Sequence, residues 1–332
     1  MEKKTVLVTG GTGSFGRAFV KILLEKFSPQ RVIVFSRDEL KQFEMQTESD
    51  SQLPTMRFFL GDVRDVDRLE MAFRDVDIVI HAAALKQVPA AEYNPFECIR
   101  TNVHGAENVV KASIRAGVKR VIALSTDKAA SPINLYGASK LASDKIFTAA
   151  HWLVGSKVEP KFSVVRYGNV LGSRGSVVPF FRDQISRGSE SLPITDPRMT
   201  RFWITLEEGV AFVLSCLPLM QGGEIFVPKI PSMKIVDLAR VMAPRMNTHV
   251  VGIRPGEKLH ESMITSDDAR NTYELPDRYV ITPEQPQDRA AYHPAERLVR
   301  EDFSYVSDKN SEWLSDEVLV GLLAGLGISP AA

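Results

Sequence analysis

The chain has 332 residues, 44% of them hydrophobic, and its 41 lysines and arginines are balanced by 41 aspartates and glutamates. This is the profile of a soluble globular protein with a full-sized core, organised as one large domain or as two fused lobes. The zero formal net charge gives no electrostatic reason to expect a nucleic-acid or membrane-surface partner, and the two distant cysteines predict a reducing compartment rather than a disulfide framework.

The N-terminus MEKKTVLVTGG reaches its first glycines after a short apolar run. That run is too short for a secretory signal or a membrane span, so we expect a cytoplasmic protein without a membrane partner. It fits instead the first of several buried parallel strands, which are rich in Val, Ile and Phe and nearly uninterrupted. The predicted strands are TVLVT, RVIVFS, MRFFLGDV, DIVIHAAA, RVIALST and FSVVRYG.

Segments with helical apolar spacing lie between these strands, at residues 15–26, 65–74, 94–116 and 134–152. This alternation predicts an α/β fold with a doubly wound, Rossmann-type parallel sheet over residues 1–168. After Gly168 the rhythm breaks, with helices expected at 205–217 and 234–243 and a strand at 224–227. We expect residues 169–332 to form a smaller mixed α/β lobe, some of whose elements could return to the first domain.

The glycine-rich turn TGGTGSFG follows the first predicted strand directly. Glycine lets a backbone approach a pyrophosphate closely and present N–H groups at a helix N-terminus, so this position predicts a dinucleotide site. The alternative is a merely tight strand-to-helix turn. The predicted cofactor contacts in the turn are Gly10, Gly13, Ser14, Phe15 and Gly16.

The end of the second strand indicates which nicotinamide cofactor binds. An NAD site usually places an acid there, whereas this chain has Ser36 and Arg37, which can hold a ribose phosphate, with Lys41 adding charge. NADP is therefore favoured over NAD, although Asp38 lies close enough to leave NAD open. Further cofactor contacts are expected after the third and fourth strands, at Asp62, Val63 and Ala82.

Tyr136 and Lys140 lie four residues apart on a predicted helix, so they share a face. A free phenol has a pKa of about 10, too high for a base near neutrality. A neighbouring ammonium and an oxidised nicotinamide would both favour the phenolate, which could then take a proton from a hydroxyl. An isolated pair of this kind is usually a solvated helix face, but its place after the fifth strand favours catalysis.

TGGTGSFG, HAAA, YGASK and, near the C-terminus, RPGEKLHE resemble the extended short-chain dehydrogenase/reductase superfamily and its nucleotide-sugar branch. Sugar 4-epimerases of that branch usually offer only a Ser or Thr where Thr126 stands. Here Asp127 and Lys128 follow, and STDKAASPINLYGASK is similar to the UDP-N-acetylglucosamine 4,6-dehydratases. The likeness is greatest to their soluble inverting members, which form homo-oligomers and supply pseudaminic acid synthesis; the large retaining relatives usually carry Met at the position of Tyr136.

This resemblance implies a lyase that acts on UDP-N-acetylglucosamine. Oxidation of carbon 4 to a ketone makes the carbon 5 hydrogen acidic, so that a base can remove it while an acid protonates the departing carbon 6 oxygen. The resemblance assigns Lys128 as the base and Asp127 as the acid, with Thr126 beside the reacting hydroxyl. Because lysine titrates near 10.4 and aspartate near 3.9 in water, burial and charge must shift both. A solvated loop with an ion pair is the alternative.

The sugar nucleotide needs cationic or backbone partners for its diphosphate. The resemblance places Arg254 on the diphosphate and Glu257 on a ribose hydroxyl, with Arg201 as another candidate; surface arginines that cap loops are the alternative. Asn169 could contact the diphosphate or the sugar through its amide, and Lys86 could reach the acetamido sugar. No histidine, cysteine or carboxylate spacing indicates a metal site. The competing functions are a UDP-hexose 4-epimerase, a retaining 4,6-dehydratase and a cofactor-sensing regulator; Tyr136 with Lys140 argues against the last.

Overall fold

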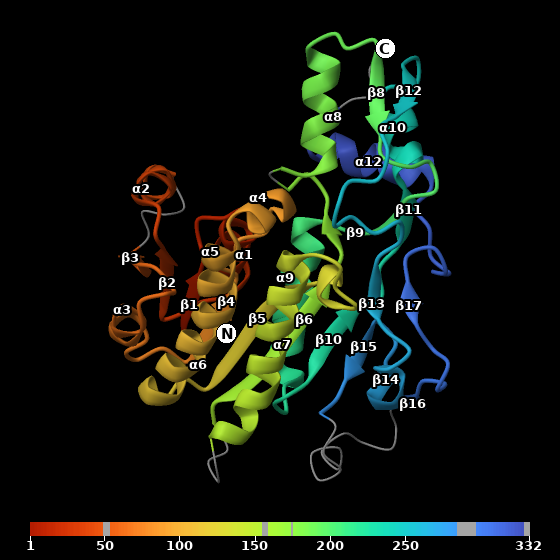
Figure 1. The fold of residues 1–332 in the computed structure, drawn as a ribbon. Helices are drawn as coiled ribbons and strands as arrows, with labels where there is room; N and C mark the ends of the chain where they lie inside the picture. Colours follow the sequence, from red (N-terminus) through yellow and green to blue (C-terminus); the bar gives the residue numbers. More distant parts are fainter. Residues whose placement is uncertain (49–53, 155–158, 174, 284–296, 329–332) are drawn as a thin grey trace.

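The computed structural model describes residues 1–48, 54–154, 159–173, 175–283 and 297–328. Within these residues, the centre of the molecule is a ten-stranded sheet in the order β16-β14-β15-β10-β6-β5-β4-β1-β2-β3 (Figure 1). The strands from β3 to β10 run parallel. The order reverses between β1 and β4, which is where doubly wound sheets form a crevice at the carboxyl ends of their strands. The predicted fold class is confirmed.

Every strand expected from the apolar runs is present. They are β1 (Thr5–Thr9), β2 (Arg31–Ser36), β3 (Met56–Leu60), β4 (Ile78–His81), β5 (Arg120–Thr126), β6 (Lys161–Tyr167) and β10 (Ile225–Pro228). The third and fourth strands end earlier than the runs MRFFLGDV and DIVIHAAA suggested. The small and polar residues that follow them belong to loops at the crevice, and this is why their side chains can line a site rather than a core.

Helices cover both faces of the sheet, which explains why its strands are apolar throughout. Alternate residues of β1 face opposite cores: Val6 and Val8 pack with Phe19 of one layer, and Leu7 packs with Phe147 of the other. The first layer contains α1 (Ser14–Lys26), α2 (Glu39–Thr47) and α9 (Leu206–Cys216), and the second contains α3 (Val66–Ala72), α6 (Gly105–Ala116) and α7 (Leu135–Leu153).

The helix expected at 94–116 is interrupted. It consists of α5 (Pro95–Ile99), a π-helical turn at Arg100–His104 and then α6, and a short helix, α4 (Val88–Tyr93), precedes it. The wide turn carries the buried side chain of Asn102, which accepts a hydrogen bond from Leu85 N at 2.8 Å and donates one to Leu85 O at 2.9 Å. A π-helical turn is a common device at functional sites, and here it fixes the loop that carries Lys86.

The elements after β6 pack in two regions of the molecule. One group of elements packs around a third core, at the end of the molecule where Figure 1 labels α8 and β8. This group comprises α8 (Val177–Ser186), β8 (Ser191–Ile194), β9 (Thr200–Ile204), β11 (Ser232–Lys234), α10 (Ile235–Met242) and α12 (Asp316–Gly325). Two further strands pair with it: β7 (Asn169–Val170) with β9, and the exposed β12 (Asn247–Val250) with β8. The strand expected at 224–227 is β10, which lies beside β6 in the large sheet.

The remaining strands complete the large sheet or cross its end. Three antiparallel strands follow β10 at the edge of the sheet, namely β15 (Arg278–Ile281), β14 (Thr272–Glu274) and β16 (Arg297–Leu298). A separate pair, β13 (Ser262–Ile264) with β17 (Tyr305–Val306), lies near the 3₁₀ turn Asp127–Ala129 that follows β5. In the part of the chain that the structure describes, no helix is both long enough and apolar enough to cross a bilayer.

Candidate active site

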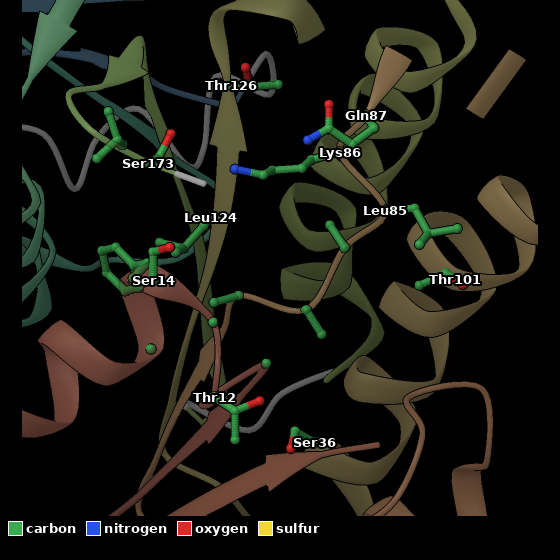
Figure 2. A pocket seen from close by; sticks show the side chains of 18 of the residues that line it. Thr12, Ser14, Ser36, Leu85, Lys86, Gln87, Thr101, Leu124, Thr126 and Ser173 are labelled. Carbon is green, nitrogen blue, oxygen red and sulfur yellow. The ribbon is translucent and has the colours of Figure 1, made fainter. Parts of the chain in front are cut away.

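A cavity of about 630 Å³ opens at the carboxyl ends of β1, β2, β4 and β5. Figure 2 shows the Lys86 side chain extending into it from the loop that follows β4. All the residues predicted to contact a dinucleotide line this cavity: Gly10, Gly13, Ser14, Phe15, Gly16, Ser36, Arg37, Lys41, Asp62, Val63, Ala82, Tyr136 and Lys140. The lining also includes Thr126, Lys128, Lys86 and Asn169.

The glycine turn is packed too tightly for side chains. Gly10 has a φ of +67°, and a Cβ there would lie 2.8 Å from Ala83 N; at Gly16 a Cβ would lie 2.5 Å from the Cα of Gly11. Gly13 caps α1 without a side-chain hydrogen bond, so the first N–H groups of the helix remain available to an anion. This close backbone cradle at a helix N-terminus fits the pyrophosphate of a dinucleotide.

The acid that could have indicated NAD, Asp38, also lines the cavity, but it is paired with Lys41. Asp38 caps α2 by accepting hydrogen bonds from Lys41 N at 3.0 Å and from Lys41 Nζ at 2.5 Å, and the side-chain hydrogen bond is the main cause of its lowered pKa. The guanidinium of Arg37 is 55% exposed and lies 3.7 Å from a carboxylate oxygen of Asp62. Ser36 accepts a hydrogen bond from Gln42 Nε2 at 3.1 Å.

Local packing brings α7, which carries Tyr136 and Lys140, against the turn that follows β5. The N-cap residue of α7, Asn134, accepts a hydrogen bond from Gly137 N and donates one to Gly256 O, both at 2.7 Å. Gly137 has no room for a Cβ, which would lie 2.3 Å from Lys128 O. A glycine directly after Tyr136 therefore lets the start of α7 rest on the backbone of Lys128, and the two catalytic candidates come together.

Tyr136 is not poised as a base in the free protein. Burial raises its pKa to about 12, although the nearby Lys128 ammonium acts to lower it. Lys140 donates a hydrogen bond to Leu124 O at 2.6 Å; burial lowers the pKa of Lys140, and the Asp144 carboxylate one turn further along α7 opposes that shift. The expectation that a cation favours the phenolate thus holds for Lys128, a residue that the sequence argument had not connected with Tyr136.

Lys128 lies between two buried carboxylates. Its Nζ is 3.0 Å from Oδ1 of Asp127 and 3.4 Å from Oε1 of Glu261, and these two acids are 0% and 2% exposed. Burial alone would lower the pKa of Lys128, but the two carboxylates raise it well above its usual range. The expected fall of this pKa toward neutrality is therefore wrong for the free protein. Asp127 contributes most to the rise, and Glu261, which is far away in the sequence, adds to it.

The residues predicted to hold the sugar nucleotide lie in two places. Lys86 and Asn169 line the cavity, whereas the described lining does not include Arg201, Arg254 or Glu257. Arg201 is 6% exposed and donates hydrogen bonds to the carbonyl oxygens of residues 200, 258 and 259. Arg254 is 60% exposed, with its guanidinium 3.8 Å from the Glu257 carboxylate.

Several residues of the site were not predicted. Glu261 is the last residue of the segment RPGEKLHE, and in that segment Lys258 donates a hydrogen bond from Nζ to Ala130 O at 2.6 Å. The cavity also takes in Ser173 and Ser176 before α8. Among the described residues, Ser176 Oγ and Asn169 Oδ1 are buried without a hydrogen-bond partner. Glu261 could have been suspected from the sequence, because it ends the motif RPGEKLHE. Ser176 could not, because its burial in the cavity depends on the fold.

No group of three histidine, cysteine or carboxylate side chains is close enough to hold a metal ion in the described ranges. His81 lies at the end of β4, and its Nδ1 is 2.8 Å from the hydroxyl of Thr9 at the end of β1. Burial is the main cause that lowers its pKa to about 3. His81 is therefore a neutral packing and hydrogen-bonding residue.

The sequence model of a family described as polysaccharide biosynthesis protein matches residues 6–283. The chain belongs to this family. It is 57% identical over 327 residues to the UDP-N-acetylglucosamine 4,6-dehydratase (inverting) of Campylobacter jejuni, covering 96% of this chain and 97% of that protein. It is 42% identical to a UDP-glucose 4-epimerase of Rickettsia canadensis, covering 84% of this chain and 82% of that one.

Among solved structures, the X-ray structure of Pen from Bacillus thuringiensis superposes with a TM-score of 0.88 at 36% identity, covering 98% of this chain and 99% of that one. Together with the Campylobacter relative, this likeness confirms the predicted resemblance to the extended short-chain dehydrogenases/reductases and, within them, to the inverting dehydratases.

Proposed function

We propose that this chain is an inverting UDP-N-acetylglucosamine 4,6-dehydratase that uses NADP. The observation that carries the proposal is the position of Lys128, which lies beside Tyr136 at the cavity with its ammonium 3.0 Å from the buried carboxylate of Asp127. A 4-epimerase needs only the residues that oxidise and reduce carbon 4. An acid and an amine next to them are what an elimination requires in addition.

Tyr136 takes the proton of the carbon 4 hydroxyl, with Thr126 beside it at the end of β5 and the charge of Lys128 favouring the phenolate. When bound, NADP would supply the hydride acceptor at carbon 4 and the hydride returned to carbon 6. Lys128 then removes the carbon 5 proton, and the electrons of that C–H bond form an enolate with the ketone. As the enolate collapses, Asp127 gives a proton to the carbon 6 oxygen, which leaves as water.

The proton balance of this step explains the close pair. Elimination needs Lys128 as a neutral amine and Asp127 as a neutral acid, whereas the free protein holds them as an ion pair. The two states differ only by the position of one proton along a 3.0 Å hydrogen bond, so the pair exchanges them without gaining or losing charge. After elimination, the ammonium and the carboxylate are both restored. A 5-inverted product, UDP-2-acetamido-2,6-dideoxy-beta-L-arabino-hex-4-ulose, requires reprotonation of carbon 5 from the opposite face.

NADP is proposed because the end of β2 presents Ser36, Arg37 and Lys41 to the cavity while Asp38 is occupied as a helix cap. Asp62 and Val63 would lie by the adenine, and Ala82 leaves space for the cofactor. An exposed guanidinium can form a bidentate contact with a phosphate on the adenosine ribose.

The sugar nucleotide is proposed to lie between the two regions 1–168 and 169–332, with the diphosphate near the N-terminus of α8. The unpartnered Asn169 Oδ1 and Ser176 Oγ there support a polar ligand. Lys86 would reach the acetamido sugar. Arg254 and Glu257 would bind the diphosphate and the ribose once their loop closes on the ligand. Arg201 would act by holding that loop through its hydrogen bonds to the carbonyl oxygens of residues 258 and 259.

We also propose a cytoplasmic homo-oligomer whose product enters pseudaminic acid or related surface-sugar synthesis. The side chains of Tyr93 and Phe96, on α4 and α5, are 87% and 79% exposed, which supports a protein partner on that face. The thiols of Cys98 and Cys216 are both free and buried, which supports a reducing compartment.

The experiment that tests this function uses UDP-N-acetylglucosamine labelled with deuterium at carbon 4. A dehydratase that recycles its cofactor moves the label to the new methyl group at carbon 6. The second candidate is a UDP-hexose 4-epimerase, favoured by the Rickettsia relative of that name. An epimerase returns the label to carbon 4 and leaves the carbon 6 hydroxyl in place, so proton NMR and mass spectrometry of the product separate the two.

A further inference from the structure

Glu261 has the features of a residue placed for chemistry rather than for folding. It is 2% exposed, and its Oε1 lies 3.4 Å from Lys128 Nζ and 3.8 Å from Arg201 Nε. Its Oε2 is buried with no hydrogen-bond partner among the described residues. Burying a carboxylate with an unsatisfied oxygen is costly, so a fold without a use for the charge would favour a neutral side chain there.

The backbone around Glu261 holds its carboxylate in place. Glu261 N donates a hydrogen bond to Ser307 Oγ at 3.0 Å, and Ser307 N donates one to Glu261 O at 2.8 Å. These contacts lie at the start of the β13–β17 pair, which packs near the turn that carries Lys128. On the other side, Lys258 ties the same loop to Ala130 O. The backbone of Glu261 is thus held by Ser307 on one side, and its loop is tied by Lys258 to the turn that carries Lys128 on the other.

We propose that Glu261 is a positioning residue that acts through Lys128: its carboxylate orients the amine toward the sugar and stabilises the ammonium that forms when Lys128 takes the carbon 5 proton. This inference rests on the proposed dehydratase function. It extends the pair of Asp127 and Lys128 to a triad, in which one carboxylate exchanges a proton with the amine and the other keeps its charge. The logic is that of the aspartate that orients and stabilises the histidine of a serine hydrolase.

The two carboxylates have different tasks because of their surroundings. Asp127 shares a hydrogen bond with Lys128 and another with the hydroxyl of Thr126, both at 3.0 Å, so it lies on the path of the proton. Glu261 Oε1 lies 3.8 Å from Nε of Arg201, a permanent cation. In the proposed triad Glu261 therefore supplies a fixed charge, while Asp127 exchanges the proton with Lys128.

The remaining charged and titratable groups around Lys128 determine the effect of removing Glu261. The cations that act on Lys128 or share its surroundings are Arg201, Lys86 and Lys258, and the other groups are Asp127 and Tyr136. Glu261 is one of only two carboxylates within salt-bridge distance of Lys128 in the described residues. Without its charge the cluster becomes more cationic, so Lys128 holds its proton less tightly and loses a partner that orients its amine. The lower proton affinity makes the neutral amine easier to form, so a slower elimination without this charge reports the lost orientation.

The test is Glu261→Gln, which keeps the shape of the side chain and removes the charge. With UDP-N-acetylglucosamine, we expect the cofactor still to be reduced at carbon 4, so that the absorbance of reduced nicotinamide accumulates. Deuterium incorporation at carbon 5 and dehydration should fall about 10²-fold in kcat. The apparent pKa that governs the rise of the elimination rate with pH should fall by about 1 unit or more. Glu261→Asp, which keeps the charge, should restore part of the rate and the wild-type pH dependence.

Glu224→Gln is the matched control, because Glu224 is an equally buried carboxylate whose oxygens accept hydrogen bonds from Ser163 and from the backbone N–H groups of 221 and 222. It should exchange carbon 5 at the wild-type rate. Normal exchange and an unchanged pH profile in Glu261→Gln would overturn the proposal. So would a joint loss of carbon 4 oxidation and carbon 5 exchange in both Glu261 variants, since the residue would then be structural. If the wild-type protein itself does not dehydrate the substrate, the proposed function fails instead.

Discussion

The proposed preference for NADP depends on Arg37, and replacing this residue gives a prediction whose size can be worked from the structure. The guanidinium is 55% exposed, so its attraction to a ribose phosphate is screened nearly as in water. Two unit charges 4 Å apart in water attract by about 1 kcal/mol, and a phosphate monoester carries a charge of about −1.5 to −2. Arg37→Ala should therefore weaken NADP binding by about 1.5–2 kcal/mol, or about 10- to 30-fold.

Isothermal titration of the cofactor-free protein with NADP and with NAD provides the measurement. NAD has no phosphate at that position, so its Kd should change by less than about twofold, within the usual effect of a surface substitution. Arg300→Ala is the matched control: that arginine is 80% exposed and is paired with Asp302, as Arg37 is with Asp62. If Arg37→Ala weakens NADP and NAD by the same factor, the guanidinium does not recognise the phosphate and the argument for NADP is lost.

Three further substitutions test the catalytic helix, the glycine turn and the buried histidine. Tyr136→Phe should slow cofactor reduction by substrate at least about 10²-fold in stopped-flow absorbance, and a wild-type rate would remove Tyr136 from the mechanism. Gly16→Ala places a Cβ 2.5 Å from the Cα of Gly11, so it should lower the free energy of unfolding by about 1–3 kcal/mol in urea titrations. The control Gly321→Ala, whose Cβ meets nothing within 4 Å, should not lower it. Equal effects of the two substitutions would contradict the packing argument. Burial lowers the pKa of His81 to about 3, so between about pH 6.5 and pH 3 the unfolded state binds a proton that the folded state does not. The free energy of unfolding should therefore fall by about 1.4 kcal/mol per pH unit as the pH drops through this range. His81→Gln should remove this part of the pH slope, and an unchanged slope would refute the neutral assignment.

The sequence was sufficient for the sheet and for the cofactor cradle, for reasons that are local. Strands buried on both faces read as continuous apolar runs, and parallel strands bring the residues that follow them to one edge. The residues after β1, β2 and β4 could thus be expected to meet, as Gly13, Ser36 and Ala82 do in the cavity. The interrupted helix before α6 was missed because the hydrogen bonds of Asn102 to the Leu85 backbone are tertiary contacts.

The chemistry around Lys128 was only partly predictable. The motif identified the amine and Asp127, which are neighbours in the chain. The rise in the pKa of Lys128 depends also on Glu261, which a strand on the far side of the catalytic turn brings to 3.4 Å. The burial of Arg201 could not be predicted either, because it depends on hydrogen bonds to the carbonyl oxygens of residues 258 and 259, which are distant in the sequence.

Proton NMR of the wild-type protein with UDP-N-acetylglucosamine in deuterated water tests the central claim most directly. We expect a 4-keto-6-deoxy product that carries deuterium at carbon 5, with inverted configuration there and without net reduction of the cofactor. Retained configuration at carbon 5 would contradict the inverting mechanism while leaving a dehydratase. A 4-epimer with its carbon 6 hydroxyl intact would contradict the roles of Asp127 and Lys128 altogether.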